Sequence, residues 1–316
     1  MARSKSLDGP YELHPNWHLL TSKDSPDAPL PRAGHGQIVE TPDGQVYHTH
    51  LCSRPIPGTK RSPMGRETAM QKCEWRADGW LYLVGGGMVP AVEVAPPKPA
   101  ARIEKAKLTR YAFDGALPLD FQWLRTPHPE RIFSLKDRPG HLRLYGRESV
   151  GSWFEQALVA RRQEDFCYRA ETELAFAPAT IQQVAGLTAY YNRHKFHMLA
   201  ITWHEVHGRS LTILSCEGDW PDTRLSFPLP QGVKLGDGDV KLAVTVAFEK
   251  LQFAYSEAGV GWRDIGPVLD ASLLSDEAGR GEHASFTGAF VGMIAFDTSG
   301  AAAPADFGYF TYERRI

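Results

Sequence analysis

The sequence lacks several features that would each have indicated a class of protein. It contains no apolar run close to the roughly 18 residues that a membrane span needs, so no membrane partner is expected. The N-terminal residues are basic but no apolar segment follows them, and the sequence gives no sign of a signal peptide. Because 35 lysines and arginines do not outnumber 37 aspartates and glutamates, nothing predicts a nucleic-acid partner.

Cysteine pairs and nucleophile motifs are also missing. The four cysteines, Cys52, Cys73, Cys167 and Cys216, are widely spaced and form no CxxC motif. This usage favours buried, reduced thiols in a cytoplasmic protein over a disulfide framework. The sequence has no GxSxG motif and no P-loop, and the glycines at 85–87 precede no helix start, so neither an elbow-type hydrolase nor a nucleotide site is indicated.

Helical spacing of apolar residues is scarce, whereas alternating strand patterns are frequent. "GHGQIVETPDGQVYHTHL" predicts two strands joined by a turn at 42–44. "ETAMQKCEW" and "GWLYLVGGG" predict two more, joined by a turn at 77–79. A short helical turn is expected only at "DASLLSDEAG".

The part of the chain after residue 105 is denser in strands. Ten or so alternating segments follow one another with tight turns and no crossover helices, which predicts an antiparallel β-sandwich. In "VKLAVTVAFEK" the pattern places Val240, Leu242, Val244, Val246 and Phe248 on one face.

A proline-rich stretch, "VAPPKPAARIEKAK", reads as a linker and predicts two domains, residues 1–104 and 105–316. The first region holds about five strands and little apolar content. A sheet of that size leaves edges unpaired and one face unburied, so we interpret it as part of a larger domain.

Two histidine pairs resemble metal ligands in their spacing. His194 and His197, like His204 and His207, are three positions apart. On a strand this spacing directs the two rings to opposite faces, so a zinc site is not expected there.

Three histidines of the first domain are further candidates. His48 and His50 share a strand face and either line a cavity or face solvent, with solvent slightly favoured by the pattern. His35, flanked by glycines in "AGHG", stands where the open backbone lets a side chain reach a ligand or metal. The alternative is a histidine ring satisfied within the core.

No pair of carboxylates in the first domain predicts acid and base catalysis. The available residues are Glu40, Glu67, Glu74 and Glu93. Glu67 follows Arg66, and a neighbouring guanidinium lowers the pKa of a carboxyl, so Glu67 reads as an ion-paired group and not as a general acid.

Seven segments together resemble the β-xylosidases of glycoside hydrolase family 43. They are "ARSKSLDGPYELHP", "AGHGQIVETPDGQVYHTHLCSRP", "PMGRETAMQKCEW", "DRPGHLRLYGRES", "ALVARRQ", "GPVLDASLLSDE" and "FTGAFVGM". The resemblance implies an all-β chain: the C-terminal blades of a five-bladed β-propeller, followed by a concanavalin-like antiparallel β-sandwich. It also implies an inverting exo-enzyme that removes xylose or arabinose from xylo-oligosaccharides or arabinosyl oligosaccharides.

The resemblance assigns roles to three residues. Arg66 matches an arginine that reaches into the sugar pocket, and His35 matches a histidine beneath it, where some members place Ca²⁺ with mostly water ligands. Phe286, with Phe290 as the alternative, matches a phenylalanine that closes one wall of the pocket. The alternative is a purely structural role for each residue: an ion pair between Arg66 and Glu67, and core packing for Phe286.

The family's acid, base and orienting carboxylate precede the segment that Met1 matches. We therefore expect the chain to be an N-terminally truncated form without catalytic residues and nearly inactive. The alternatives are a non-catalytic carbohydrate-binding or accessory protein, and a gene model whose upstream codons hold the rest. Open propeller edges would favour association, including a homo-oligomer.

Overall fold

The chain alternates between extended segments and tight turns, and nearly all regular secondary structure of its described residues is antiparallel strand. The computed structural model describes residues 1–99, 104–218, 225–257, 259–279 and 286–315. Helix in these residues is limited to two short 3₁₀ turns, η1 (Pro129–Arg131) and η2 (Ala271–Leu273). The turn predicted in "DASLLSDEAG" is confirmed by η2, whose start is capped by the Asp270 carboxylate accepting from the Ser272 N–H at 2.8 Å. None of the described helices is long and apolar enough to cross a membrane.

The chain forms two compact units. The first consists of residues 1–55 and 65–104, and the second of residues 56–64 and 105–316. The short segment 56–64 therefore belongs with the second unit although it falls within the range 1–104. Part of the proline-rich linker, residues 100–103, lies outside the described residues.

The first unit contains a four-stranded antiparallel meander in the order β3-β4-β5-β6 and a separate pair, β1-β2. Both predicted hairpins are confirmed. A four-stranded meander is the form of a propeller blade. The strands are β1 (Ala2–Arg3), β2 (Glu12–Leu13), β3 (Gly36–Glu40), β4 (Val46–Cys52), β5 (Glu67–Trp75) and β6 (Leu81–Leu83).

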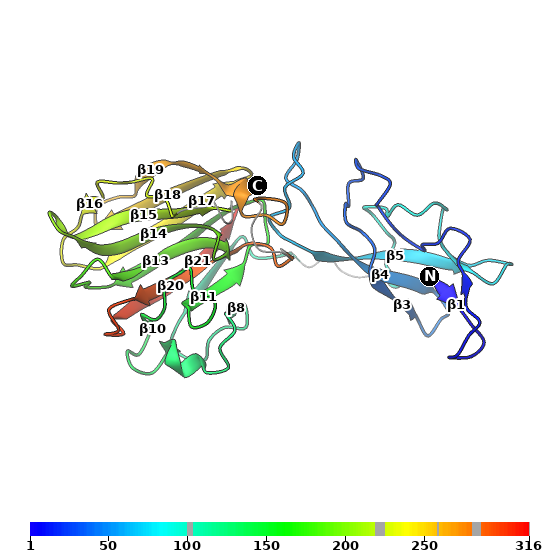
Figure 1. Ribbon diagram of the computed structural model, residues 1–316, viewed down its shortest axis with the longest axis horizontal. Coiled ribbons are helices and arrows are strands. Elements are labelled where there is room, and N and C mark those ends of the chain that lie inside the picture. Colours follow the sequence, from blue (N-terminus) through cyan, green and yellow to red (C-terminus); the bar gives the residue numbers. More distant parts are fainter. Residues whose placement is uncertain (100–103, 219–224, 258, 280–285, 316) are drawn as a thin grey trace. The chain divides into compact units, whose positions relative to one another are not determined.

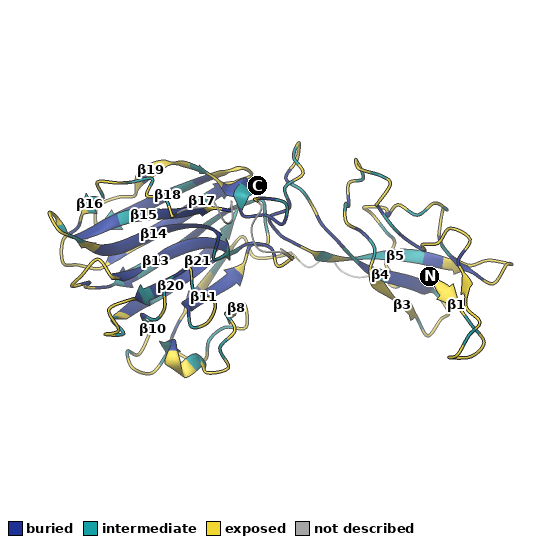
Figure 2. Cartoon of the chain, viewed as in Figure 1, coloured by how far each residue is buried: buried dark blue, intermediate teal, exposed yellow. Residues whose placement is uncertain are grey.

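Burial in this meander is uneven. β4 is largely buried, whereas every residue of the edge strand β3 is exposed (Figure 2). In β5 the polar Gln71 is buried on the same face as Cys73, because its amide exchanges two hydrogen bonds with the Ala91 backbone, at 2.9 and 3.0 Å. Burial raises the pKa of the Cys73 thiol to about 11, which keeps it protonated and unreactive.

The second unit is a sandwich of two antiparallel sheets, as predicted (Figure 1). One sheet runs in the order β19-β18-β17-β12-β21-β10-β9, with β7 also paired to β21. Its strands are β7 (Leu108–Ala112), β9 (Phe133–Ser134), β10 (Leu142–Tyr145), β12 (Cys167–Ala175), β17 (Val240–Ala247), β18 (Lys250–Glu257), β19 (Arg263–Asp270) and β21 (Pro304–Arg314).

The other sheet runs in the order β16-β15-β14-β13-β20-β11-β8 and is called the seven-stranded sheet below. Its strands are β8 (Phe121–Trp123), β11 (Ala157–Arg162), β13 (Gln183–Asn192), β14 (Lys195–His204), β15 (Gly208–Glu217), β16 (Val233–Lys234) and β20 (Phe290–Asp297).

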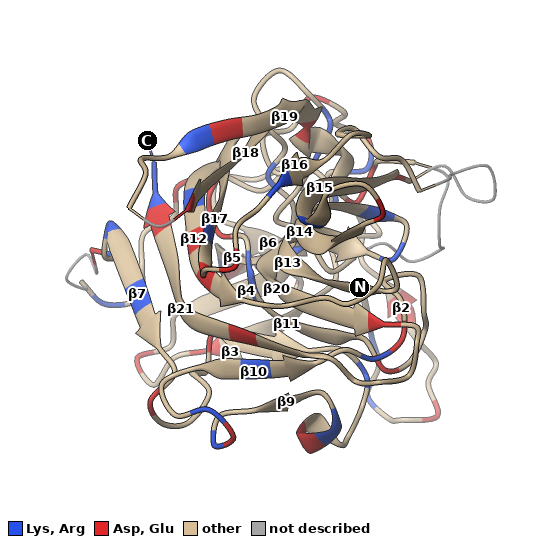
Figure 3. Cartoon of the chain, turned by 90° about the vertical axis from the view of Figure 1, so that its left-hand side faces the viewer, with Lys and Arg blue, Asp and Glu red and all other residues tan. Residues whose placement is uncertain are grey.

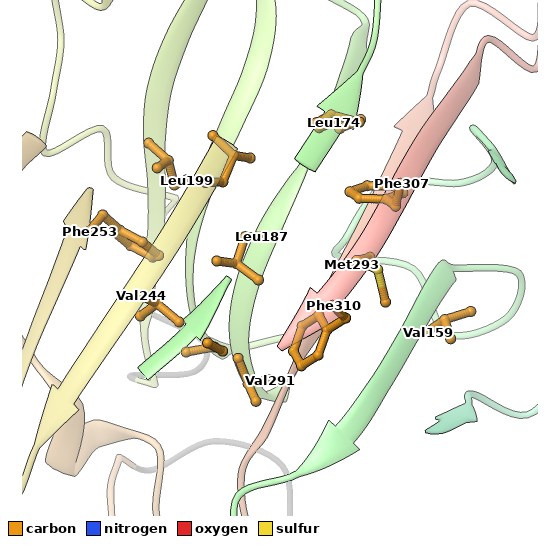
Figure 4. Packing of buried hydrophobic residues seen from close by; sticks show 14 of the residues in the cluster. Val159, Leu174, Leu187, Leu199, Val244, Phe253, Val291, Met293, Phe307 and Phe310 are labelled. Atoms are coloured by element: carbon orange, nitrogen blue, oxygen red, sulfur yellow. The ribbon is translucent and has the colours of Figure 1, made fainter. Parts of the chain in front are cut away.

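The main core fills the space between the two sheets. Leu187 and Met293 from the seven-stranded sheet meet Val244, Phe253 and Phe310 from the other sheet (Figure 4). Each fully buried apolar side chain of this kind contributes about 1.5–3 kcal/mol.

The face predicted for residues 240–248 is confirmed from Val240 to Val246, but the prediction for Phe248 is wrong. Phe248 follows the last residue of β17, has a φ of 55° and is 46% exposed, because the chain turns there into β18.

The seven-stranded sheet is also apolar on its outer face. Leu158, Phe196, Met198 and Leu214 form a second cluster there, which Val150 from the loop after β10 joins. This explains why β13 is buried along nearly its whole length instead of alternating. The sheet is thus covered on both faces, and the loops over its outer face can carry a site.

Glycine is required at position 186 in β13 because β14 approaches the backbone closely there. A Cβ at this position would lie 2.0 Å from the Leu199 carbonyl oxygen. We expect Gly186→Ala to lower the free energy of unfolding of the sandwich by about 1–3 kcal/mol, as overpacking does, and urea unfolding measures this change. Gly238→Ala is the control, because its Cβ would meet nothing within 4 Å. Equal stability of the two variants would contradict the packing argument.

Candidate functional site

Arg66 is exposed and stands immediately before β5. The neighbouring Glu67 carboxylate is held by Arg54, whose Nε and Nη2 donate to its two oxygens at 2.8 and 2.7 Å. Such a two-point contact fixes the carboxylate at the start of the strand. The described partner of Glu67 is therefore Arg54, and the role of Arg66 in a sugar pocket stays a prediction.

His35 is exposed and lines a hollow of about 450 Å³ in the first unit. We call it the histidine hollow, after His18, His35 and His48, which all line it. Its position depends on Gly36, where a Cβ would lie 1.9 Å from the Thr49 carbonyl oxygen, so the segment can run this close to β4 only with glycine.

The solvent-facing interpretation of His48 and His50 is wrong. The two residues are only 8% and 2% exposed, and their rings stack with centroids 5.9 Å apart. Burial, followed by the charge of His50, lowers the pKa of His48. The alternative, that this strand face lines a cavity, holds for His48.

The protein groups around His35 would leave most of the ligands of a Ca²⁺ ion to water. This ion takes six to eight oxygen ligands, whereas the described lining of the histidine hollow offers imidazoles, a glutamine and main-chain groups without a carboxylate. The described residues also contain no cluster of three or more histidines, cysteines or carboxylates placed to hold a metal ion. We derive no chemical step through a metal.

The prediction that the rings of His204 and His207 point to opposite faces of a strand is wrong. The described residues nevertheless contain no metal cluster. The two histidine rings stack with centroids 4.8 Å apart. The reason is that β14 ends at His204 and the chain turns before β15, so the two residues do not share a strand.

Phe286 lies in the sandwich and is 47% exposed, whereas Phe290 is half-buried in β20. The flanking residues are firmly held. On one side the buried Lys195 donates from Nζ to the Ser275 and Ala278 carbonyls, at 2.8 and 3.2 Å. On the other side the Ala289 carbonyl accepts from the Gln163 N–H at 2.9 Å. Phe286 is thus the more exposed of the two rings, and its role as a wall residue, with Phe290 as the alternative, stays a prediction.

The same stretch is tied to segment 56–64 within the second unit. The Ser62 N–H donates to the Glu277 carboxylate at 2.7 Å, and the Ala289 N–H donates to the Pro63 carbonyl at 2.6 Å. Both residues of the segment are buried. Arg66 follows shortly after this segment but belongs to the first unit, so the prediction that Arg66 and Phe286 converge on one sugar-sized hollow stays a prediction.

Comparison with known proteins decides the family. Residues 110–313 match the beta xylosidase C-terminal concanavalin A-like domain, and residues 1–81 match glycosyl hydrolases family 43. The chain belongs to glycoside hydrolase family 43. Its all-β fold and its β-sandwich agree with that assignment.

Relatives of this family resemble the chain over nearly all of its length. It is 50% identical to a xylosidase/arabinosidase 43B of Humicola insolens, over 98% of the chain and 58% of the relative. It is 40% identical to a beta-xylosidase of Bacillus subtilis, over 100% of the chain and 60% of the relative. The crystal structure of a xylan beta-1,4-xylosidase from Bacillus halodurans superposes with a TM-score of 0.91, at 40% identity, over 99% of the chain and 59% of that protein. The chain thus spans about three-fifths of the length of these relatives.

Sequence reasoning missed a second hollow, on the outer face of the seven-stranded sheet. Trp123, Arg125, Arg162 and Tyr190 are among the residues around it. The adjacent arginines of "ALVARRQ" could have indicated it, because neighbouring residues on a strand point to opposite faces of the sheet, and one of the two must therefore face outwards. Arg161 is buried and donates to the Tyr111 hydroxyl at 2.7 Å, while Arg162 is exposed.

His197 holds the last residue of β19, Asp270, and its burial makes that support pH-dependent. Its ring contacts the Ser215 hydroxyl at 2.9 Å and the Asp270 carbonyl at 3.1 Å. Burial lowers the pKa of His197 below its ordinary 6.5, although the contact with Asp270 opposes the shift. As pH falls below about 6.5, His197 is protonated in the unfolded chain but stays neutral in the folded chain. Its contribution to the free energy of unfolding is therefore complete above that pH and is lost below it.

We therefore expect the stability advantage of the unaltered chain over His197→Gln to shrink between about pH 7 and pH 5, by up to about 1.4 kcal/mol per unit of pKa shift. Denaturant unfolding of the sandwich at several pH values measures it. A difference that stays constant over this range would show that His197 does not titrate in this way.

Proposed function

We propose that the chain supplies part of the substrate-binding wall of an inverting, exo-acting glycosidase of the β-xylosidase and α-L-arabinofuranosidase type. The exposed guanidinium of Arg66 at the start of β5 carries the proposal, because Arg66 lies in the part of the chain that matches the family. The relatives named as xylosidases and arabinosidases support xylo-oligosaccharides and arabinosyl oligosaccharides as the substrate class.

In this proposal Arg66 and Phe286 have different tasks. A guanidinium presents a rigid fork of N–H donors to sugar hydroxyls and stays charged at any working pH. Its charge also favours the ionised form of nearby carboxylates. The exposed ring of Phe286 closes one side of the pocket, which would restrict cleavage to the end of the oligosaccharide.

The chemistry of such an enzyme needs two carboxyl groups, one to activate water and one to protonate the leaving oxygen. Neither the histidine hollow nor the hollow on the sandwich is lined by a carboxylate among the described residues. We infer that the 316-residue chain binds sugar without cleaving it, and that the complete activity belongs to a longer protein.

Hydrolysis by the chain alone should therefore be close to background. The assay is release of p-nitrophenol from the β-xyloside and the α-L-arabinofuranoside by purified chain. Turnover at an ordinary glycosidase rate, about 1 per second or more, would overturn this prediction.

Substitution of Arg66 tests the binding role directly. We expect Arg66→Gln to weaken xylobiose binding about tenfold or more, because a charge-assisted hydrogen bond is lost, and calorimetric titration measures the change. Arg76→Gln is the matched control, since Arg76 pairs with Glu74 on an exposed surface of the same unit. Unchanged affinity in Arg66→Gln would remove Arg66 from the pocket.

The second candidate function is a non-catalytic carbohydrate-binding or accessory role. The hollow on the sandwich favours it, because it lies in the second unit and needs nothing from the first. Calcium at His35, association into a homo-oligomer and a cytoplasmic location stay predictions.

A further inference from the structure

The hollow on the sandwich has an apolar floor. It lies on the outer face of the seven-stranded sheet, where β8, β11, β13 and β20 contribute residues, and its volume is about 300 Å³. Leu124, Leu158, Ala160 and Tyr190 belong to its lining and also pack in or against the outer hydrophobic cluster. This volume is at the lower end of the range of small-molecule sites.

Three guanidiniums surround this floor, and we call the site the arginine hollow. Arg125, Arg162 and Arg193 all line it. Arg193 and Arg125 lie over the Trp153 ring, at 3.6 and 5.4 Å from its centroid. Arg162 lies 5.1 Å from the Phe290 ring centroid and donates to the Thr287 carbonyl.

The backbone at Arg125 has an unusual conformation. Its φ of 56° lies in the left-handed region, which costs free energy for a residue with a side chain. Nearby, the Trp123 indole donates to the Thr126 carbonyl at 3.1 Å, and Arg125 donates to the Trp153 carbonyl at 3.2 Å. These contacts hold the arginine at the hollow instead of letting it extend into solvent.

Arg125 and Arg162 differ from many arginines of the sandwich, which pair with carboxylates. Arg143 binds Asp306 at 2.7 Å and Arg314 binds Asp165 at 2.7 Å. In contrast, the lining of the arginine hollow contains no carboxylate among the described residues. The described hydrogen bonds of Arg125 and Arg162 use one N–H each, so most of their five donors remain for a ligand.

The positive charge of the hollow does not reflect a general excess of basic residues on the surface. Both signs are scattered over the sandwich (Figure 3), in keeping with a net charge of -2. The positive charge of the arginine hollow is therefore local.

We propose that the arginine hollow binds a sugar that carries a carboxylate, such as a uronosyl unit attached to an oligosaccharide. The guanidinium forks of Arg125 and Arg162 match a carboxylate, which they can bind through two points. The apolar floor and the Trp123 ring match the C–H face of a sugar ring. A neutral sugar leaves the charge without a partner, and a bare phosphate leaves the floor uncovered.

The test is calorimetric titration of the whole 316-residue chain at low salt. The probes are xylotriose bearing one 4-O-methylglucuronosyl unit and plain xylotriose. The acidic probe should bind about tenfold more tightly or better, and the doubly substituted Arg125→Gln, Arg162→Gln chain should lose this preference. Arg263→Gln is the control, because this exposed arginine in β19 lies in the opposite sheet and outside the hollow.

Further arms separate the proposal from its alternatives. The preference should persist in Arg66→Gln, so that failure of the pocket role of Arg66 leaves this test intact. A double Arg→Lys variant keeps the charge but loses the fork, and should retain an intermediate preference for the acidic probe. Equal binding of both xylotrioses, full competition by inorganic phosphate at equal concentration, or an unchanged preference in the double glutamine variant, with an unaltered circular dichroism spectrum, would each overturn the proposal.

Discussion

Burial of the seven-stranded sheet on both of its faces is the constraint on which the rest of the sandwich depends. One face packs against the other sheet around Leu187 and Phe253, and the opposite face carries its own cluster around Met198 and Leu214. An apolar face must be removed from water, so loops and strand ends have to cover it. The loops do not fully cover the outer face of the sheet at β8 and β11, and the uncovered part is the arginine hollow.

Burial at the start of β14 also requires polar contacts, which hold residues 275–278. A buried ammonium is costly without partners, and Lys195 meets that cost by donating to two main-chain carbonyls. These bonds hold the Ser275 and Ala278 carbonyls in the turn that follows η2.

Much of the architecture could be predicted because it rests on local patterns. Alternation in β12, turns at Gly44 and Gly79 and the scarcity of helical spacing were enough to indicate hairpins and a sandwich. One failure occurred where burial is decided by distant neighbours, and another where a strand ends earlier than its pattern predicts. His48 reads as solvent-facing from its strand but is covered in the folded unit, and Phe248 reads as core but falls in a turn.

The candidate sites were predictable to a smaller extent, and for a different reason. The roles of Arg66 and Phe286 came from a resemblance, and that of His35 from its flanking glycines together with the resemblance; all three residues are exposed. The residues of the arginine hollow come from four strands and three loops, and no local sequence pattern predicts that they lie together. Only the adjacency of Arg161 and Arg162, one inward and one outward, pointed towards it.

Segment 56–64 has a consequence for how the chain acquires its fold. The Ser62 N–H and the Glu277 carboxylate that it contacts are 215 positions apart. Closing so long a loop costs conformational entropy, and this cost arises before the contact can stabilise the fold. On a ribosome the early segment would emerge long before the strands that receive it, so the sandwich cannot be finished until nearly the whole chain has been made. Nor can it be excised with a single cut at the linker, since part of its own surface is encoded ahead of that point.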